Sequence, residues 1–165
     1  MDKRYFLIIF IAIFCLINLY VIADFSDVVG SSYADVGKYT FSLPSDFNLV
    51  NSQDSSVVIN NPNNLYIAVF SLDYSDYNYT EGLENLKNST TVNIVSMGTL
   101  NIDNISVDAV YYEDFKSNSN KSIFYFHKDN HPFRINMENF DIDNKEYTIN
   151  ALEDIIQSIK LNYKI

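Results

Sequence analysis

Several residue types are scarce in this chain of 165 residues, which has one cysteine, no tryptophan, four glycines and three prolines. The single cysteine, Cys15, cannot form a disulfide within the chain, and its place inside an apolar run excludes a catalytic thiol. Little glycine and proline, together with 13 tyrosines and 12 phenylalanines, argues against disorder. This composition favours a folded domain rich in β-sheet.

Positive charge is also scarce. The chain has 11 lysines and arginines against 21 aspartates and glutamates, a formal net charge of −10 at neutral pH. The acidic residues are spread along the chain instead of forming a tail. Nucleic acids and anionic lipid head groups both require a positive protein surface, so the charge balance argues against both as partners.

One long hydrophobic run is present, at residues 5–23, and as a helix its 19 residues would reach about 28 Å, close to the thickness of a bilayer core. Lys3 and Arg4 precede the run and no comparable basic cluster follows it, so the rest of the chain is predicted to be exported. The same pattern fits a signal peptide cleaved before Asp24. The sequence therefore predicts either a single-pass cell-membrane protein with an extracytoplasmic domain or a secreted protein.

After this segment, residues 24–37 lack a periodic pattern and are predicted to form a spacer, and residues 38–165 are predicted to form one domain. In Lys38–Pro44 apolar side chains alternate, as in a half-buried strand. Residues 65–72 and 123–126 are apolar on both faces, which indicates central strands. Further strands are predicted at residues 56–60, 92–102, 107–115, 121–127 and 132–140.

Two helices are predicted. The first is short and begins with Thr80 as its N-cap, followed by acidic residues in its first turn. The second closes the chain, begins near the capping-box pair Asp143 and Glu146, and has an apolar face. That face consists of Ile149, Leu152, Ile155, Ile156, Ile159 and Tyr163. The predicted fold is α+β: one twisted antiparallel sheet of about six or seven strands with both helices packed on it.

This order of elements resembles the PsbP family, which is named after an extrinsic subunit of photosystem II and shares its α/β/α sandwich with a nuclear Ran-binding protein. The likeness rests on an aromatic strand that ends in Leu43-Pro44 and on the closing Ile155-Ile156, Ser158 and Ile159-Lys160. It is strongest for PsbP-related proteins exported by prokaryotes, methanogenic archaea included. The resemblance implies a non-catalytic module that docks onto a membrane complex or another envelope protein, and no metal or partner site carries over with it.

Three tyrosines, Tyr74, Tyr77 and Tyr79, are candidates for a partner-binding surface, because rigid amphipathic side chains beside small polar residues are typical of recognition surfaces. The alternative is that they hold their loop on the sheet, and large aromatic side chains more often have that role. The sequence also contains four glycosylation sequons, which would be used only in a host with the machinery. Their acceptor residues are Asn78, Asn88, Asn104 and Asn120.

Metal and catalytic sites are not predicted. His127, Asp129 and His131 share one predicted turn, but zinc sites need three or four converging ligands. Two acidic groups lack the glycine turn and ligand spacing of a calcium loop. These groups are Asp73, Asp76, Asn78 and Glu81, and Asp141, Asp143 and Glu146. The function hypothesis is therefore a non-catalytic, membrane-anchored accessory module without a cofactor, and the alternative is a secreted ligand-binding protein or hydrolase with a pocket beside the sheet.

Overall fold

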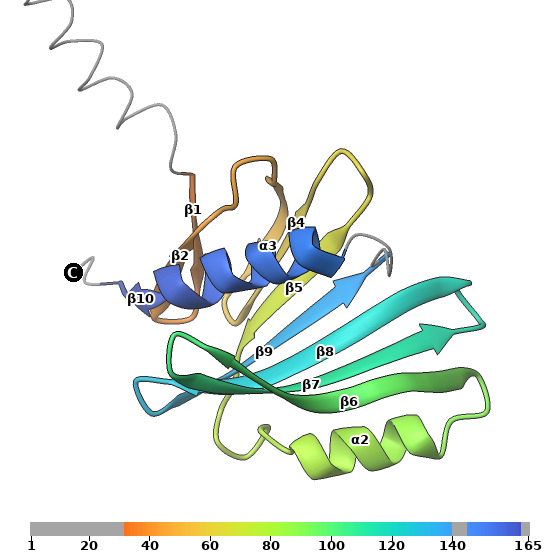
Figure 1. Ribbon diagram of the computed structural model, residues 1–165. Coiled ribbons are helices and arrows are strands. Elements are labelled where there is room, and N and C mark those ends of the chain that lie inside the picture. Colours follow the sequence, from red (N-terminus) through yellow and green to blue (C-terminus); the bar gives the residue numbers. More distant parts are fainter. Residues whose placement is uncertain (1–31, 140–144, 163–165) are drawn as a thin grey trace, which may run out of the picture. The chain divides into compact units, whose positions relative to one another are not determined.

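The computed structural model describes residues 32–139 and 145–162 (Figure 1). The predicted membrane segment, residues 5–23, lies outside the described residues, as does the pair Asp141 and Asp143. Among the helices that are described, none is long and apolar enough to cross a membrane. A compact unit begins at Tyr33, inside the predicted spacer.

The main element of this unit is a sheet of seven antiparallel strands in the order β3-β4-β5-β9-β8-β7-β6 (Figure 1). Its strands are β3 (Asn48–Gln53), β4 (Ser56–Asn60), β5 (Tyr66–Ser71), β6 (Val92–Ile102), β7 (Ile105–Asp114), β8 (Ser119–Lys128) and β9 (His131–Glu138). The two strands that are apolar on both faces, β5 and β8, lie inside the sheet, as predicted. The α+β class with an antiparallel sheet is thus confirmed. Strand β3 was not predicted, because all its side chains are exposed and no alternation marks it.

The prediction of a single sheet is wrong. Strands β1 (Tyr33–Val36), β2 (Tyr39–Ser42) and β10 (Lys160–Leu161) form a second sheet in the order β1-β2-β10. The alternating pattern of β2 correctly indicated that Tyr39 and Phe41 are buried, but such a pattern does not specify which strand is the neighbour. The closing helix also ends earlier than predicted, because the chain leaves it at Ser158 to pair with β2.

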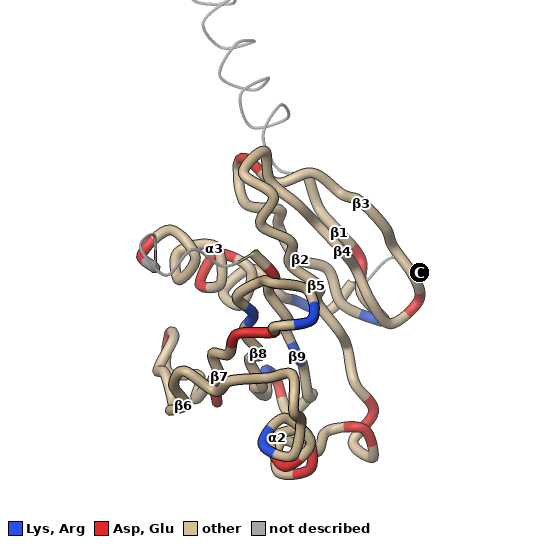
Figure 2. The backbone as a smooth tube through the Cα atoms, turned by 90° about the vertical axis from the view of Figure 1, so that its right-hand side faces the viewer, with Lys and Arg blue, Asp and Glu red and all other residues tan. Residues whose placement is uncertain are grey.

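The two helices lie on opposite sides of the large sheet, whereas acidic residues are spread over the whole unit (Figures 1 and 2). Helix α3 (Lys145–Ser158) buries Leu152, Ile155 and Ile156 on the face that carries most of the core. Helix α2 (Tyr79–Lys87) has no buried residue and lies over the other face. Its N-cap is Asn78 rather than the predicted Thr80, because the Asn78 carboxamide oxygen accepts a hydrogen bond from the Glu81 amide at 3.0 Å.

The end of α3 is held by polar contacts from both sheets. The Lys128 ammonium group, at the end of β8, donates to the carbonyl oxygens of Ile156 and Gln157 at 2.5 and 2.7 Å. A cation at this place satisfies carbonyl groups that have no partner within a helix and complements the helix dipole. On the other side, the Ser42 amide donates to the Ser158 hydroxyl at 3.0 Å. These contacts hold β2 near the turn between β8 and β9.

Candidate functional site

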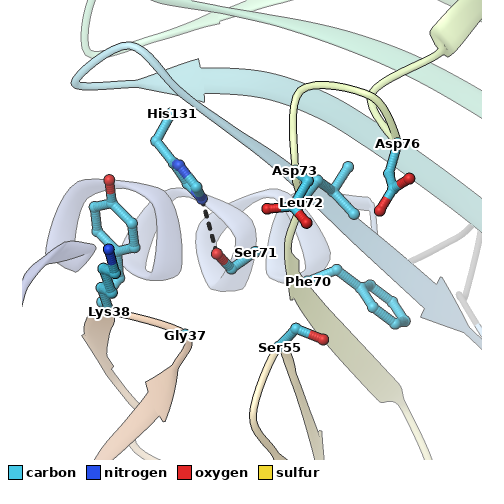
Figure 3. Close-up of a pocket in the computed structure, with 10 residues that line it drawn as sticks. Gly37, Lys38, Ser55, Phe70, Ser71, Leu72, Asp73, Asp76 and His131 are labelled. Carbon is cyan, nitrogen blue, oxygen red and sulfur yellow. Dashed lines mark hydrogen bonds between the residues drawn. The ribbon is translucent and has the colours of Figure 1, made fainter.

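A pocket of about 440 Å³ lies where the end of β5 and the start of β9 meet the turn between β1 and β2 (Figure 3). Its lining comes from four segments that are distant in sequence. The lining residues are Gly37, Lys38, Tyr39, Ser55, Phe70, Ser71, Leu72, Asp73, Asp76 and His131. The pocket therefore brings together His131 with Asp73 and Asp76, which the sequence had placed in two separate candidate groups.

The central pair of the pocket is Ser71 and His131, with the Ser71 hydroxyl 2.8 Å from Nε2 of the imidazole (Figure 3). The imidazole stacks on the Tyr39 ring at a centroid distance of 4.6 Å and meets the edge of Phe133 at 4.9 Å. Burial lowers the pKa of His131 below its usual value, and nearby Asp73 opposes this effect in part. The lowered pKa favours the neutral imidazole at pH 7, and in this form the pair contributes polarity without charge.

Charge in the pocket comes from three side chains at its rim. Lys38 lies on the side of the β1–β2 turn, and Asp73 and Asp76 lie on the side of the loop that follows β5 (Figure 3). Among the described residues the ion pairs are those of Lys121 with Asp114 and Glu138, at 3.0 and 3.2 Å, and none involves the pocket. The rim thus presents unpaired charges of opposite sign across the opening.

Gly37 controls how closely the β1–β2 turn approaches Ser71. Its φ of +61° is unfavourable for a residue with a side chain, and a Cβ there would lie 2.9 Å from the Ser71 hydroxyl oxygen. Gly37→Ala is expected to lower the free energy of unfolding by about 1–2 kcal/mol from the backbone conformation alone, and to displace Ser71. Urea denaturation measures the loss.

The matched control for this substitution is Gly98→Ala, because Gly98 lies in a strand and a Cβ there would meet nothing within 4 Å. Alanine at this position is expected to leave stability unchanged or to raise it by up to about 1 kcal/mol. Equal effects at the two glycines would show that the turn does not depend on Gly37.

The three candidate tyrosines have different environments. The Tyr74 side chain is 68% exposed, and its hydroxyl donates to the Asn130 carbonyl oxygen in the turn before β9. By contrast, Tyr77 and Tyr79 are half-buried and pack edge-on against Tyr125, at centroid distances of 5.7 and 5.5 Å. Burial raises the pKa of both hydroxyls. Tyr77 and Tyr79 therefore hold the loop and α2 on the sheet, whereas Tyr74 lies exposed beside the pocket.

The two histidines do not converge on a common ligand. His131 faces Tyr39, whereas the His127 ring lies 4.3 Å from the Tyr77 ring, among the residues beneath α2. Within residues 32–139 and 145–162, no three histidine, cysteine, aspartate or glutamate side chains are grouped as metal ligands would be. The Ser71–His131 pair was missed by sequence analysis, because nothing in the local pattern relates the end of β5 to the start of β9.

The sequon asparagines differ in how freely they could accept a glycan. Asn88 caps the end of α2, Asn104 lies in the turn between β6 and β7, and both are exposed. The side-chain amide of Asn78 already donates to the Glu81 carboxylate at 2.9 Å. Asn120 was expected in a turn but lies within β8 and is half-buried. Asn88 and Asn104 are therefore the more accessible acceptors.

Comparison with known proteins gives similarity only to solved structures. No protein-family model and no curated protein matches the chain. It is similar to a Bacteroides thetaiotaomicron protein at 15% identity and a TM-score of 0.43, covering 82% of this chain and 49% of the other. It is also similar to LpqN, involved in cell envelope biogenesis of Mycobacterium tuberculosis, at 14% identity and a TM-score of 0.41, covering 80% and 90%.

A third similar structure is the solution structure of cyanobacterial PsbP from Synechocystis. The identity is 11% and the TM-score 0.45, and the match covers 79% of this chain and 91% of the other. At these values the comparisons concern the path of the chain and do not extend to ligands or partners. A cyanobacterial PsbP is therefore among the solved structures to which the chain is similar, and the PsbP family is the one whose resemblance was noted in the sequence.

Proposed function

We propose that this chain is a non-catalytic binding module of the cell envelope, anchored in the membrane by residues 5–23 with its domain on the extracytoplasmic side. The apolar segment after Lys3 and Arg4 supports the anchor and its orientation. Its partner is another envelope protein or a membrane complex. The observation that carries the binding role is Tyr74, an exposed aromatic side chain beside a pocket with unpaired charges at its rim.

The surroundings of Ser71 favour binding over catalysis. A serine hydrolase needs a nucleophile with a base, which Ser71 and His131 could supply, and amide donors for the oxyanion. The amides of Gly37, Ser71 and Leu72 instead donate to the carbonyl oxygens of Asp54, Ser55 and Pro132, at 2.6, 3.0 and 3.1 Å. These three amides are therefore not directed at a substrate. Ligand binding in this pocket is therefore the second candidate function, and the pocket favours it over hydrolysis.

The proposed partner surface is tested by chemical crosslinking in intact cells, followed by mass spectrometry of the membrane fraction. Wild-type protein is expected to give reproducible links to one membrane complex, and peptides from the first 23 residues should be retained. Tyr74→Ala is expected to remove these links. The ring is exposed in the free protein and would be buried by the partner, and buried aromatic side chains carry much of the binding energy of an interface. The side chain is 68% exposed and its one described hydrogen bond, to the Asn130 carbonyl oxygen, lies at the surface, so the domain should still fold.

Tyr66→Ala serves as the matched control. Tyr66 is also an exposed tyrosine, at 36%, but it begins β5 whereas Ser71 ends it. At about 3.3 Å per residue the two ends of this strand are roughly 16 Å apart, so the control should keep the links. Links that survive Tyr74→Ala would place the partner surface elsewhere. A mature chain that begins at Asp24 and has no specific partner would contradict the anchored module and favour a secreted ligand-binding protein.

A further inference from the structure

We infer that the pocket at the end of β5 binds a small zwitterion, a molecule between an amino acid and a dipeptide in size, with an ammonium group at one end and a carboxylate at the other. This ligand is distinct from a partner protein, so the inference does not depend on the anchored module; it specifies the ligand for the second candidate function, ligand binding in this pocket. It rests on the placement of charge around the pocket, on the apolar surface between the charges and on the rigidity of the walls.

The charges at the rim match a ligand of both signs. Asp73 and Asp76 lie on one side of the pocket and Lys38 on the other, and none of the three belongs to an ion pair in the described part of the chain (Figure 3). An ammonium group would pair with the carboxylates, and a carboxylate would pair with Lys38. A simple amine would leave Lys38 unpaired, and a simple anion would face two carboxylates. Only a molecule with both groups complements both sides.

The surface between these charges is neutral and partly apolar. Ser71 and His131 are joined by their hydrogen bond, and burial, which lowers the pKa of His131, favours the uncharged imidazole on the floor. Tyr39, Phe70 and Leu72 supply apolar area on which a short hydrocarbon spacer could pack. The volume of about 440 Å³ lies within the usual range of small-molecule sites, roughly 300–1,000 Å³.

The walls of the pocket are joined to one another by backbone hydrogen bonds. The Gly37 amide ties the β1–β2 turn to the Asp54 carbonyl oxygen at 2.6 Å, and the Leu72 amide ties the end of β5 to the Pro132 carbonyl oxygen at 3.1 Å. The Arg134 guanidinium group lies over the Phe70 ring, 4.3 Å from the ring centroid, and stabilises its position. A site that is formed before the ligand arrives loses less entropy on binding.

The test uses the full chain in detergent micelles and isothermal titration calorimetry at pH 7 and low salt, where charge pairs are least screened. The probes are ω-amino acids of increasing length, from β-alanine to 6-aminohexanoate, together with glycylglycine. Each is compared with an alkylamine and an alkyl carboxylate of the same chain length. We expect one length to bind with a single site, about 10- to 100-fold more tightly than either single-charge analogue, because its second charge gains a partner.

Substitutions then assign each charge to its wall. Lys38→Met is expected to weaken the best zwitterion to the level of its amine analogue and to leave the amine itself unaffected. Asp73→Asn combined with Asp76→Asn is expected to weaken both the zwitterion and the amine. Lys116→Met, at an exposed lysine outside the pocket, is the control and should change nothing. All these side chains are exposed, so the unfolding midpoint should be kept in every variant.

Three outcomes would overturn the inference. A zwitterion that binds no more tightly than its amine would show that Lys38 has no ligand partner. If Lys38→Met lowered the affinity for the zwitterion and for the amine equally, the substitution would have a general effect on the pocket. Failure of every probe to bind the folded wild-type chain would show that the rim charges are only solvated.

Discussion

Replacing Phe133 by alanine is expected to lower the free energy of unfolding by about 3–5 kcal/mol, a large fraction of the stability of a single domain. The Phe133 ring is fully buried in β9, at 0% exposure. It stacks on Phe126 at 5.4 Å and meets the Tyr39 ring at 5.0 Å and the His131 ring at 4.9 Å. The substitution therefore removes buried apolar area and leaves a cavity directly beneath the pocket.

Denaturant unfolding followed by circular dichroism measures this loss. Phe115→Ala is the matched control, because the Phe115 ring is 63% exposed and its loss should change stability by no more than about 0.5 kcal/mol. Since Phe133 supports the imidazole of His131, its substitution should also shift the NMR resonances of that ring. Similar stability losses at Phe133 and Phe115 would mean that the core is not organised around the β8–β9 pair.

The second large effect is expected at Asn61, whose replacement by alanine should cost about 2–4 kcal/mol. Its side chain is only 2% exposed and lies in the turn between β4 and β5. The carboxamide oxygen accepts from the amides of Asn63 and Leu65 at 3.0 and 2.9 Å, and the nitrogen donates to the Tyr147 hydroxyl at 3.0 Å. Alanine would remove all three hydrogen bonds and leave the buried Leu65 amide without its acceptor, and a buried group without a partner costs about 1–3 kcal/mol.

Two further variants separate the parts of this effect. Tyr147→Phe removes the hydrogen bond from Asn61 to α3 together with the hydrogen bond that the Tyr147 hydroxyl donates to the Asp46 carboxylate, and is expected to cost about 1–2 kcal/mol. Asn63→Ala is the control, because the Asn63 side chain is exposed and only its backbone amide takes part. Thermal or urea denaturation of the three variants should rank Asn61→Ala as the most destabilised. A rank in which Tyr147→Phe equals Asn61→Ala would assign the whole effect to α3 and none to the turn.

Much of the fold follows from the sequence, because burial leaves a pattern along the chain. Residues 65–72 and 123–126 are apolar on both faces, and both belong to interior strands. The apolar face of the closing helix predicted the burial of Leu152, Ile155 and Ile156. Strand β3 left no such pattern, because none of its side chains is buried.

Parts of the candidate site were also visible in the sequence, although not as a site. The sequence marked Asp73 and Asp76 as part of an acidic loop, His131 as one of two histidines in a turn and Tyr74 as one of three candidate partner-binding tyrosines. Their proximity was not visible, because it depends on the antiparallel pairing of β5 with β9, which puts the end of one strand beside the start of the other. Ser71 was not recognised at all, because a serine at a strand end has no distinctive spacing.

The sequence by itself determined the antiparallel α+β class, the central strands and the buried face of the closing helix. Only the tertiary structure decided that β2 pairs with β1 and β10 in a second sheet, that Ser71 meets His131 and that Lys38 faces the two aspartates across a pocket. The physical reason is that side-chain patterns record whether a position is buried, whereas strand pairing uses backbone groups that almost every residue has. Contacts between distant segments are therefore set by how the whole core packs, and no local pattern encodes them.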